Sequence, residues 1–203
     1  MRRRSTPPRD PRTITRPDAV ALPLEVTDPS SVAELARVAD DVTILVNNAG
    51  VPLKTSYLRS PLEQIRREFD VDFFGPLRTT RAFAPVIERN GGGRILNVHS
   101  VLSWIAMSGA YSATKSALWS QSNALRLELE PRGITVPGLH VGYVDTDMTA
   151  GIDEPKVSAD QVAESALDGI EADRYEILVD DMSRRVKATL SGDLVELYPS
   201  LVQ

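Results

Sequence analysis

The chain has 203 residues, enough for one domain with a sizeable core, and its 42% hydrophobic content favours a globular fold over disorder. The net charge of −5 gives no electrostatic case for binding nucleic acid. Cysteine is absent and there are only two histidines, which excludes disulfides and thiol catalysis and predicts no metal site. No apolar run is long enough to span a bilayer and none follows the N-terminal arginines, so we expect a cytoplasmic protein without membrane contact.

Residues 1–17 form a basic stretch that combines six arginines with four prolines. Because proline interrupts both helices and central strands, we expect a tail here rather than a buried element. An arm that contacts phosphates or an acidic partner is the alternative interpretation. Residues 18–203 then form the single folded domain.

Short apolar runs alternate with helical periodicity along this domain. The expected strands are 20–24, 43–46, 95–98, 134–139 and 176–179, with 43–46 of the buried type. The expected helices are 31–39, 61–89 with a kink at Gly75-Pro76, 111–129, 159–172 and 182–190, followed by a tail. The alternation predicts an α/β fold, a parallel sheet with helices on both faces. Right-handed crossovers place residues 47–50, Ser100 and the loop 141–157 on one rim of that sheet.

Tyr111 and Lys115 are four residues apart at the start of the helix expected over 111–129, so their side chains share a face. An ammonium group beside a phenol favours the phenolate and lowers the pKa of the phenol. Tyr111 is therefore a candidate general acid or base. A tyrosine and a lysine at this spacing are more often a simple surface pair, so the candidate depends on the surrounding motifs.

Several motifs occur in a fixed order on these elements. They are Asn47-Asn48-Ala49-Gly50, then Ser100, then Tyr111-Ser112-Ala113-Thr114-Lys115, then Val144-Asp145-Thr146-Asp147-Met148. Together they resemble the short-chain dehydrogenases/reductases over about residues 20–190. The resemblance implies a Rossmann-like three-layer fold. It also implies an NAD(P)-dependent oxidoreductase that interconverts an alcohol and a carbonyl by hydride transfer.

The resemblance assigns roles to residues of this chain. Tyr111 would be the acid or base, Lys115 would lower its pKa and bind the nicotinamide ribose, and Ser100 would bond the substrate oxygen. The implied cofactor-binding residues are Glu25, Val26, Asn48, Ala49, Gly50, Tyr111, Lys115, Val144 and Thr146. Trp104, Tyr143 and Met148 would line the substrate side, or would equally be packing residues. The cofactor is NAD or NADP, with NADP slightly favoured because Arg9 suits a 2′-phosphate.

The chain departs from the family pattern in its N-terminal part. The family begins with a strand and a glycine-rich turn that holds the pyrophosphate at a helix N-terminus, whereas the first glycine here is Gly50. We therefore expect the first strand–helix–strand unit to be missing and the apolar faces of neighbouring strands to be uncovered. One interpretation of this departure is a fragment that results from a misplaced start, a frameshift or a degraded gene. A truncated, non-catalytic scaffold or interaction protein that no longer binds cofactor is the functional alternative.

Two further departures lie near the expected site. Asp72 stands where the family has asparagine, and its charge would oppose a lowered pKa of Tyr111, although a salt-bridge role is equally consistent. Ser100 and Tyr111 are about two residues closer than in the family, which leaves Ser103 as a less favoured substitute. The resemblance further implies a small alcohol or carbonyl substrate. It also implies a homo-oligomer formed through the helices expected over 61–89 and 111–129.

Overall fold

The computed structural model describes residues 19–202, so the expected N-terminal tail and Arg9 lie outside the described part. Its centre is a parallel sheet in the order β1-β2-β4-β5, with β3 paired to the start of β2. The strands are β1 (Ile44–Asn47), β2 (Gly93–Val98), β3 (Ile134–Thr135), β4 (Gly138–His140) and β5 (Glu176–Leu178).

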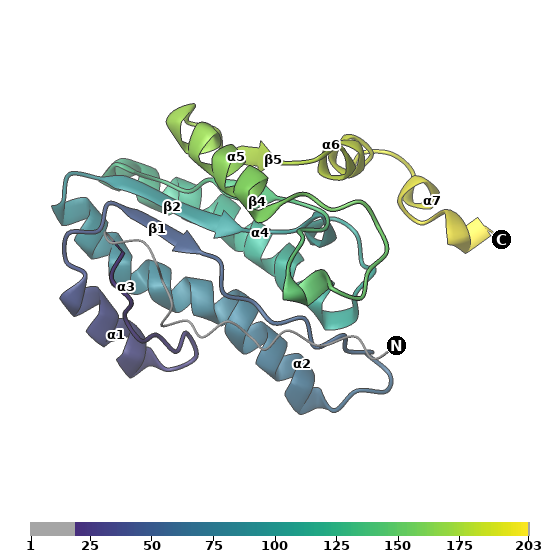
Figure 1. Cartoon of the computed structure of the whole chain (residues 1–203), viewed down its shortest axis with the longest axis horizontal. Coiled ribbons are helices and arrows are strands. Elements are labelled where there is room, and N and C mark those ends of the chain that lie inside the picture. Colours follow the sequence, from purple (N-terminus) through teal and green to yellow (C-terminus); the bar gives the residue numbers. More distant parts are fainter. Residues whose placement is uncertain (1–18, 203) are drawn as a thin grey trace, which may run out of the picture.

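The helices lie on both sides of this sheet, with α5 on one side and α1 and α3 on the other (Figure 1). They are α1 (Pro29–Val38), α2 (Leu62–Phe69), α3 (Gly75–Arg89), α4 (Gly109–Leu129), α5 (Ala159–Glu171), α6 (Asp181–Ala188) and α7 (Leu194–Leu197). None of the helices within residues 19–202 has the length and apolar character needed to cross a bilayer. The predicted α/β class with a parallel, helix-covered sheet is confirmed.

Two apolar clusters hold the layers together. The larger cluster packs α3 and α4 against one face of the sheet, and Ile87, Ile95 and Ile134 in it are fully buried. The smaller cluster packs α5 against the other face through Leu96, Leu139 and Ile177. Removing this apolar surface from water is the main contribution to the stability of the fold.

The predicted long helix over 61–89 is divided into α2 and α3 by a π-helical segment, Asp70–Phe74. The segment ends immediately before Gly75 and Pro76, where the sequence predicts a kink. The predicted strand over 134–139 is also divided, into β3 and β4. Pro137 lies between them and has no N–H to donate to the ladder, which explains the interruption.

The strand expected over 20–24 does not form, and this prediction is wrong. These residues have no regular structure, and Val20 is 81% exposed. Among the described strands β1 pairs only with β2, so no strand lies beyond it to which the 20–24 segment could bond. β1 is also not the buried type expected, because Ile44 and Val46 are about half exposed on the α5 side of the sheet, where α5 does not extend over β1.

Side-chain caps define the starts of two helices, and the expected C-terminal tail is corrected. Asp28 accepts a hydrogen bond from the Ser30 amide at the start of α1, and Ser158 forms a capping box with Gln161 at α5. The C-terminal segment is not a simple tail, because it contains α7 and a 3₁₀ turn, Pro199–Val202. The Ala106 amide donates to the Tyr198 hydroxyl at 2.7 Å, which ties this segment to the rest of the chain.

Candidate active site

A cavity of about 610 Å³ opens at the carboxyl ends of β1, β2 and β4. This is the rim on which the sequence predicts the motifs to converge, and the volume is in the range of ligand sites. The predicted site residues that line it are Asn48, Gly50, Ser100, Tyr111, Lys115, Val144 and Thr146. The structure therefore brings together residues that lie up to 98 positions apart in the chain.

Tyr111 and Lys115 point into this cavity from the first turns of α4. The Lys115 ammonium donates to the Val98 carbonyl at 3.0 Å and lies 5.5 Å from the centre of the Tyr111 ring. Lys115 is buried, and its other ammonium hydrogens have no bond to the described residues. Those hydrogens are available to hydroxyl groups of a ligand in the cavity.

The start of α4 is fixed by a buried carboxylate, Glu68, which no sequence motif singles out. Glu68 is fully buried and accepts 2.7 Å hydrogen bonds from the Leu53 amide and the Thr55 hydroxyl. Thr55 in turn accepts from the Ala110 amide at 3.2 Å. Gly109 is required beside it, because its φ is +51° and a Cβ there would lie 1.8 Å from the Thr55 carbonyl oxygen. This chain of contacts positions Tyr111.

Asp72 lies behind the cavity wall and is fully buried. Its carboxylate accepts from the Val51 amide at 2.9 Å and from the Thr114 hydroxyl at 3.5 Å. A Cβ on Gly50 would lie 3.0 Å from Asp72 Oδ1 and 3.7 Å from Lys115 Nζ, so glycine leaves room for both charged groups. Burial raises the pKa of Asp72 to about 6, against the opposing effects of Lys115 and the Val51 amide.

The pKa of Tyr111 moves in the direction opposite to the one expected from Lys115. Burial raises the pKa of Tyr111, and the negative charges of Asp72 and Glu68 raise it further. Burial also lowers the pKa of Lys115, which weakens any effect of its charge on the phenol. The expectation that Asp72 opposes a lowered Tyr111 pKa agrees with this direction.

Ser100 lies on a tight turn at the end of β2 and lines the cavity together with Tyr111. Its hydroxyl accepts from the Leu102 amide at 3.1 Å, and its carbonyl accepts from the Ser103 amide at 2.9 Å. Ser103 closes a capping box on this turn and is buried away from the cavity. The shorter spacing between Ser100 and Tyr111 therefore leaves Ser100 at the cavity, and Ser103 does not replace it.

A second cavity of about 450 Å³ adjoins the first and shares Ser100 and Tyr111 with it. Tyr143 and Met148 line this cavity, as the sequence suggests for the substrate side. Trp104 does not line it. Its ring stacks on His140 at 4.0 Å, so the packing alternative holds for Trp104.

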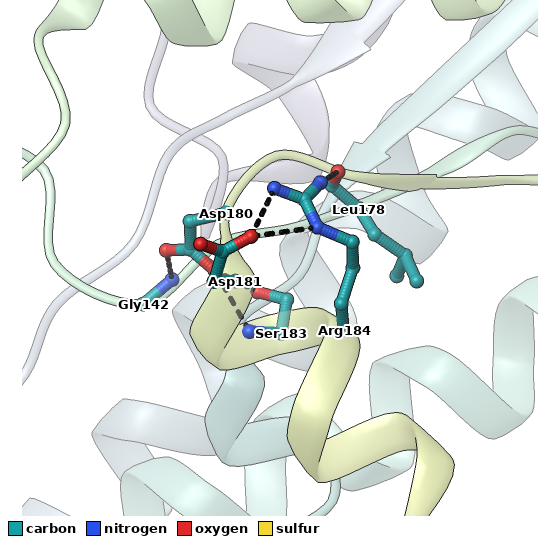
Figure 2. Close-up of polar contacts among 6 residues, drawn as sticks. All are labelled: Gly142, Leu178, Asp180, Asp181, Ser183 and Arg184. Atoms are coloured by element: carbon teal, nitrogen blue, oxygen red, sulfur yellow. Dashed lines mark hydrogen bonds and ion pairs between the residues drawn. The ribbon is translucent and has the colours of Figure 1, made fainter.

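The loop 141–157 is attached to α6 at its first glycine (Figure 2). The Gly142 amide donates to Asp180 at 2.7 Å, and Asp180 also caps α6 by accepting from the Ser183 amide at 2.8 Å. Arg184 donates to the Leu178 carbonyl and pairs with Asp181, each at 2.8 Å. The hydrogen bond between Gly142 and Asp180 holds the loop that carries Val144 and Thr146 against the start of α6.

The remaining predicted cofactor-binding residues, Glu25, Val26 and Ala49, are only partly brought to the site. Val26, Asn48 and Ala49 share a small cavity of about 160 Å³ beside β1. Glu25 is exposed and lines neither cavity, because its carboxylate turns back to accept from Thr27. The reason is that the strand expected over 20–24, which would aim Glu25 at the rim, does not form.

Sequence reasoning missed Glu68, His99 and Asp180 as residues of the site region. Glu68 follows the helical pattern of a solvated face, and only its environment shows that it is buried. His99 lines the main cavity immediately before Ser100, and its position after a strand was an available signal. Asp180 lies two residues after the end of β5 and immediately before α6, which is a recognisable capping position.

Comparison with known proteins gives consistent results. A family model described as short chain dehydrogenase matches residues 10–157. The NADPH-dependent 1-acyldihydroxyacetone phosphate reductase of Schizosaccharomyces pombe is 36% identical over 140 residues, which cover 66% of this chain and 47% of that protein. The 1-deoxy-11-beta-hydroxypentalenate dehydrogenase of Streptomyces exfoliatus is 31% identical, with 89% of this chain and 76% of that protein covered.

Among solved structures, a short chain dehydrogenase from Burkholderia cenocepacia J2315 in complex with NADP superimposes with a TM-score of 0.87 at 30% identity. The match covers 94% of this chain and 81% of the other. The chain therefore belongs to the short-chain dehydrogenase family. It spans about half the length of the Schizosaccharomyces relative.

Proposed function

We propose that this chain is an NAD(P)-dependent oxidoreductase that interconverts an alcohol and a carbonyl, with Tyr111 as acid or base. The observation that carries the proposal is the convergence of Ser100, Tyr111 and Lys115 on one cavity at the carboxyl rim of the sheet. Family membership supports the same reaction class. The matched segments cover 47% and 65% of two of its relatives. The activity and the substrate of this chain are therefore proposals.

The residues present fit the nicotinamide half of the cofactor. Lys115 has free ammonium hydrogens for ribose hydroxyls, and Asn48, Val144 and Thr146 surround the same space. The cofactor, when bound, supplies or accepts the hydride. The described residues contain no glycine-rich turn for the pyrophosphate, so we expect the affinity to come mainly from the nicotinamide side.

The chain's own groups have distinct tasks in this proposal. Ser100 donates a hydrogen bond to the substrate oxygen and orients the carbonyl in the cavity shared with Tyr143 and Met148. Tyr111 transfers the proton to or from that oxygen. Its raised pKa keeps the phenol protonated at neutral pH, and a protonated phenol is the form that donates to a carbonyl. This state favours carbonyl reduction over alcohol oxidation.

Several finer points extend the proposal. NADP is favoured over NAD, supported by the NADPH-dependent relative and by the NADP complex of the Burkholderia structure. A solved structure of a Burkholderia phymatum neighbour holds NAD, so NADH is tested beside NADPH. We also propose a cytoplasmic homo-oligomer that contacts its copy through the surfaces of α2, α3 and α4.

Replacing Tyr111 by phenylalanine tests the proposal directly. The variant keeps the ring but cannot transfer a proton, so we expect turnover of a carbonyl panel with NADPH to fall roughly 10²- to 10⁴-fold. Tyr175→Phe is the matched control, because Tyr175 is 56% exposed and lines neither cavity, and it should retain full activity. Equal activity of Tyr111→Phe and the wild type would contradict the assignment. A folded wild type that binds no cofactor would instead support the non-catalytic scaffold.

A further inference from the structure

A continuous chain of buried polar side chains runs from Thr79 on α3 to Ser100. It crosses the sheet from α3 through β1 and β2 to α4, and returns to β4. Each member is at most 8% exposed, and the proposed function uses none of them. The members are Thr79, Asn47, Asn97, Ser122, His99 and His140.

Every neighbouring pair in this chain is within hydrogen-bond distance. On the β1 side, Thr79 Oγ1 lies 2.6 Å from Asn47 Oδ1, and Asn47 Nδ2 lies 2.8 Å from Asn97 Oδ1. Asn97 Nδ2 then lies 2.8 Å from Ser122 Oγ. These contacts link the two strand ends to the middle of α4.

The histidines complete the chain on the Ser100 side. Ser122 Oγ lies 2.9 Å from His99 Nε2, and His99 Nδ1 lies 3.0 Å from His140 Nε2. His140 Nδ1 lies 3.3 Å from the Ser100 carbonyl oxygen. The chain therefore ends on the residue that faces the substrate in the proposed function.

The Ser100 end sets the direction of the hydrogen bonds made by the two histidines. A carbonyl oxygen can only accept, so His140 carries its proton on Nδ1 and leaves Nε2 as an acceptor. A neutral His99 must then donate from Nδ1 and accept at Nε2. The single hydrogen of the Ser122 hydroxyl, which also lies 2.8 Å from the Leu118 carbonyl oxygen, is therefore directed to His99. The opposite direction would place two acceptors, His140 Nδ1 and the Ser100 oxygen, 3.3 Å apart.

Both imidazoles are neutral in this arrangement. Burial lowers the pKa of His140 to about 3, and nearby Lys187 and Arg126 lower it further. Burial also lowers the pKa of His99, with added effects of His140, Lys115 and Arg126. The Trp104 ring stacks on His140 with an angle of 12° between the planes, which holds the orientation of the imidazole.

We propose that His140, oriented by His99 and Ser122, is a positioning residue that holds Ser100 in place through the Ser100 carbonyl. The effect on catalysis rests on the proposed function, whereas the hydrogen-bond pattern does not. The Ser100 carbonyl accepts two donors, the Ser103 amide and His140 Nδ1. Loss of the second donor leaves the Ser103 amide as the single donor to the Ser100 carbonyl and lets the Ser100 hydroxyl move relative to Tyr111.

The hydrogen-bond pattern can be measured without any turnover. The chain has only two histidines, so a long-range ¹H–¹⁵N spectrum of the histidine-labelled full chain shows just these two rings. We expect both rings to be neutral with the proton on Nδ1, at neutral pH and at one unit below the ordinary histidine pKa of about 6.5. A ring protonated on Nε2, or a doubly protonated ring, would overturn the proposed direction.

Two variants at one position separate donation from packing. His140→Phe keeps a ring that can stack on Trp104 but has no donor. His140→Asn places an amide N–H near the position of Nδ1. We expect kcat to fall by about 10- to 100-fold in His140→Phe with KM for NADPH unchanged, and to recover to within a few-fold in His140→Asn. The Ser100 carbonyl ¹³C resonance should move in His140→Phe and stay near the wild-type position in His140→Asn, after circular dichroism confirms that both fold.

The outcomes separate this inference from the proposed function. An active wild type with an equally active His140→Phe overturns the positioning role and leaves the function intact. Equal loss in both variants also overturns it, because the ring would then act through packing. A wild type without turnover contradicts the proposed function, and the two resonance measurements then decide whether His140 holds Ser100.

Discussion

The single residues around Tyr111 form an unusual concentration of buried charge. Asp72, Glu68 and Lys115 are each at most 4% exposed, and they lie close enough to influence one another's ionisation. Asp72 has a pKa of about 6, compared with 3.8 for an ordinary aspartate. A shift of this size corresponds to about 3 kcal/mol of free energy.

The sign of this shift determines how stability depends on pH. The folded chain binds the Asp72 proton more tightly than the unfolded chain, so ionising Asp72 destabilises the fold. The cost is absent below the unfolded pKa, grows as pH rises through about 4 to 6, and is fully present above pH 6. In Asp72→Asn the cost is removed, because the amide can still accept from the Val51 amide and can donate to Thr114.

We therefore expect Asp72→Asn to raise the free energy of unfolding at pH 7 by about 1–3 kcal/mol. The gain should shrink as pH is lowered toward 4. Urea unfolding at several pH values measures both effects. Asp40→Asn is the matched control, because Asp40 is exposed and should give no change. A variant that is less stable than the wild type at pH 7 would contradict the assignment of cost to the buried carboxylate.

At the residue scale, the sequence identified which side chains meet but not their ionisation. The spacing of Tyr111 and Lys115 and the position of Ser100 after a strand were sufficient to predict that they share one rim. The raised pKa of Tyr111 depends on burial and on Glu68, and neither can be obtained from local spacing. A glutamate in a helical pattern is normally solvated, so nothing in the sequence separates Glu68 from its exposed neighbours.

The elements follow from local signals wherever their partners are present. Asp28 and Ser158 cap α1 and α5, because each supplies a side-chain oxygen to a free amide of the first turn. The 20–24 segment has strand composition but no neighbouring strand, so it stays irregular. Composition alone cannot reveal that, because strand formation depends on pairing.

The start of α6 provides a test of one such signal. Asp180 caps α6 and also holds the Gly142 amide, so Asp180→Ala removes both interactions (Figure 2). We expect it to lower the free energy of unfolding by about 1–3 kcal/mol, because a cap contributes about 1 kcal/mol and the Gly142 amide loses its partner.

The adjacent Asp181→Ala serves as the control for this prediction. Its carboxylate is 80% exposed and pairs only with Arg184 on the surface, so the change should be within about 0.5 kcal/mol. Equal losses in the two variants, measured by urea unfolding, would show that Asp180 does not anchor the loop.

The whole molecule has a sheet that is covered unevenly. On one face α3 and α4 pack over β1, β2 and β3, whereas on the other face α5 covers β2, β4 and β5 but not β1. Ile44 of β1 is 48% exposed on this open face, whereas Ile95 of the neighbouring β2 lies on the opposite face, under α3 and α4, and is fully buried. An uncovered apolar strand face is expected from the sequence, and Ile44 and Val46 of β1 form such a face.

Two isoleucines on adjacent strands test this description. Ile95→Ala should lower the free energy of unfolding by about 2–5 kcal/mol, because it leaves a cavity in the core. Ile44→Ala should cost less than about 1 kcal/mol, because half of the side chain is already in water. Similar losses in both variants would mean that β1 is covered in solution, for example by a second chain.

The proposed function requires that this chain binds a nicotinamide cofactor in the cavity lined by Tyr111 and Lys115. The most direct measurement is a titration of NADPH and NADH into the folded full chain, following nicotinamide fluorescence, with Lys115→Met as the matched variant. We predict saturable binding by the wild type, tighter for NADPH, and loss of binding in a folded Lys115→Met. Absence of binding by the folded wild type would contradict cofactor binding by this chain. Equal binding by Lys115→Met would contradict the role of Lys115 in holding the cofactor.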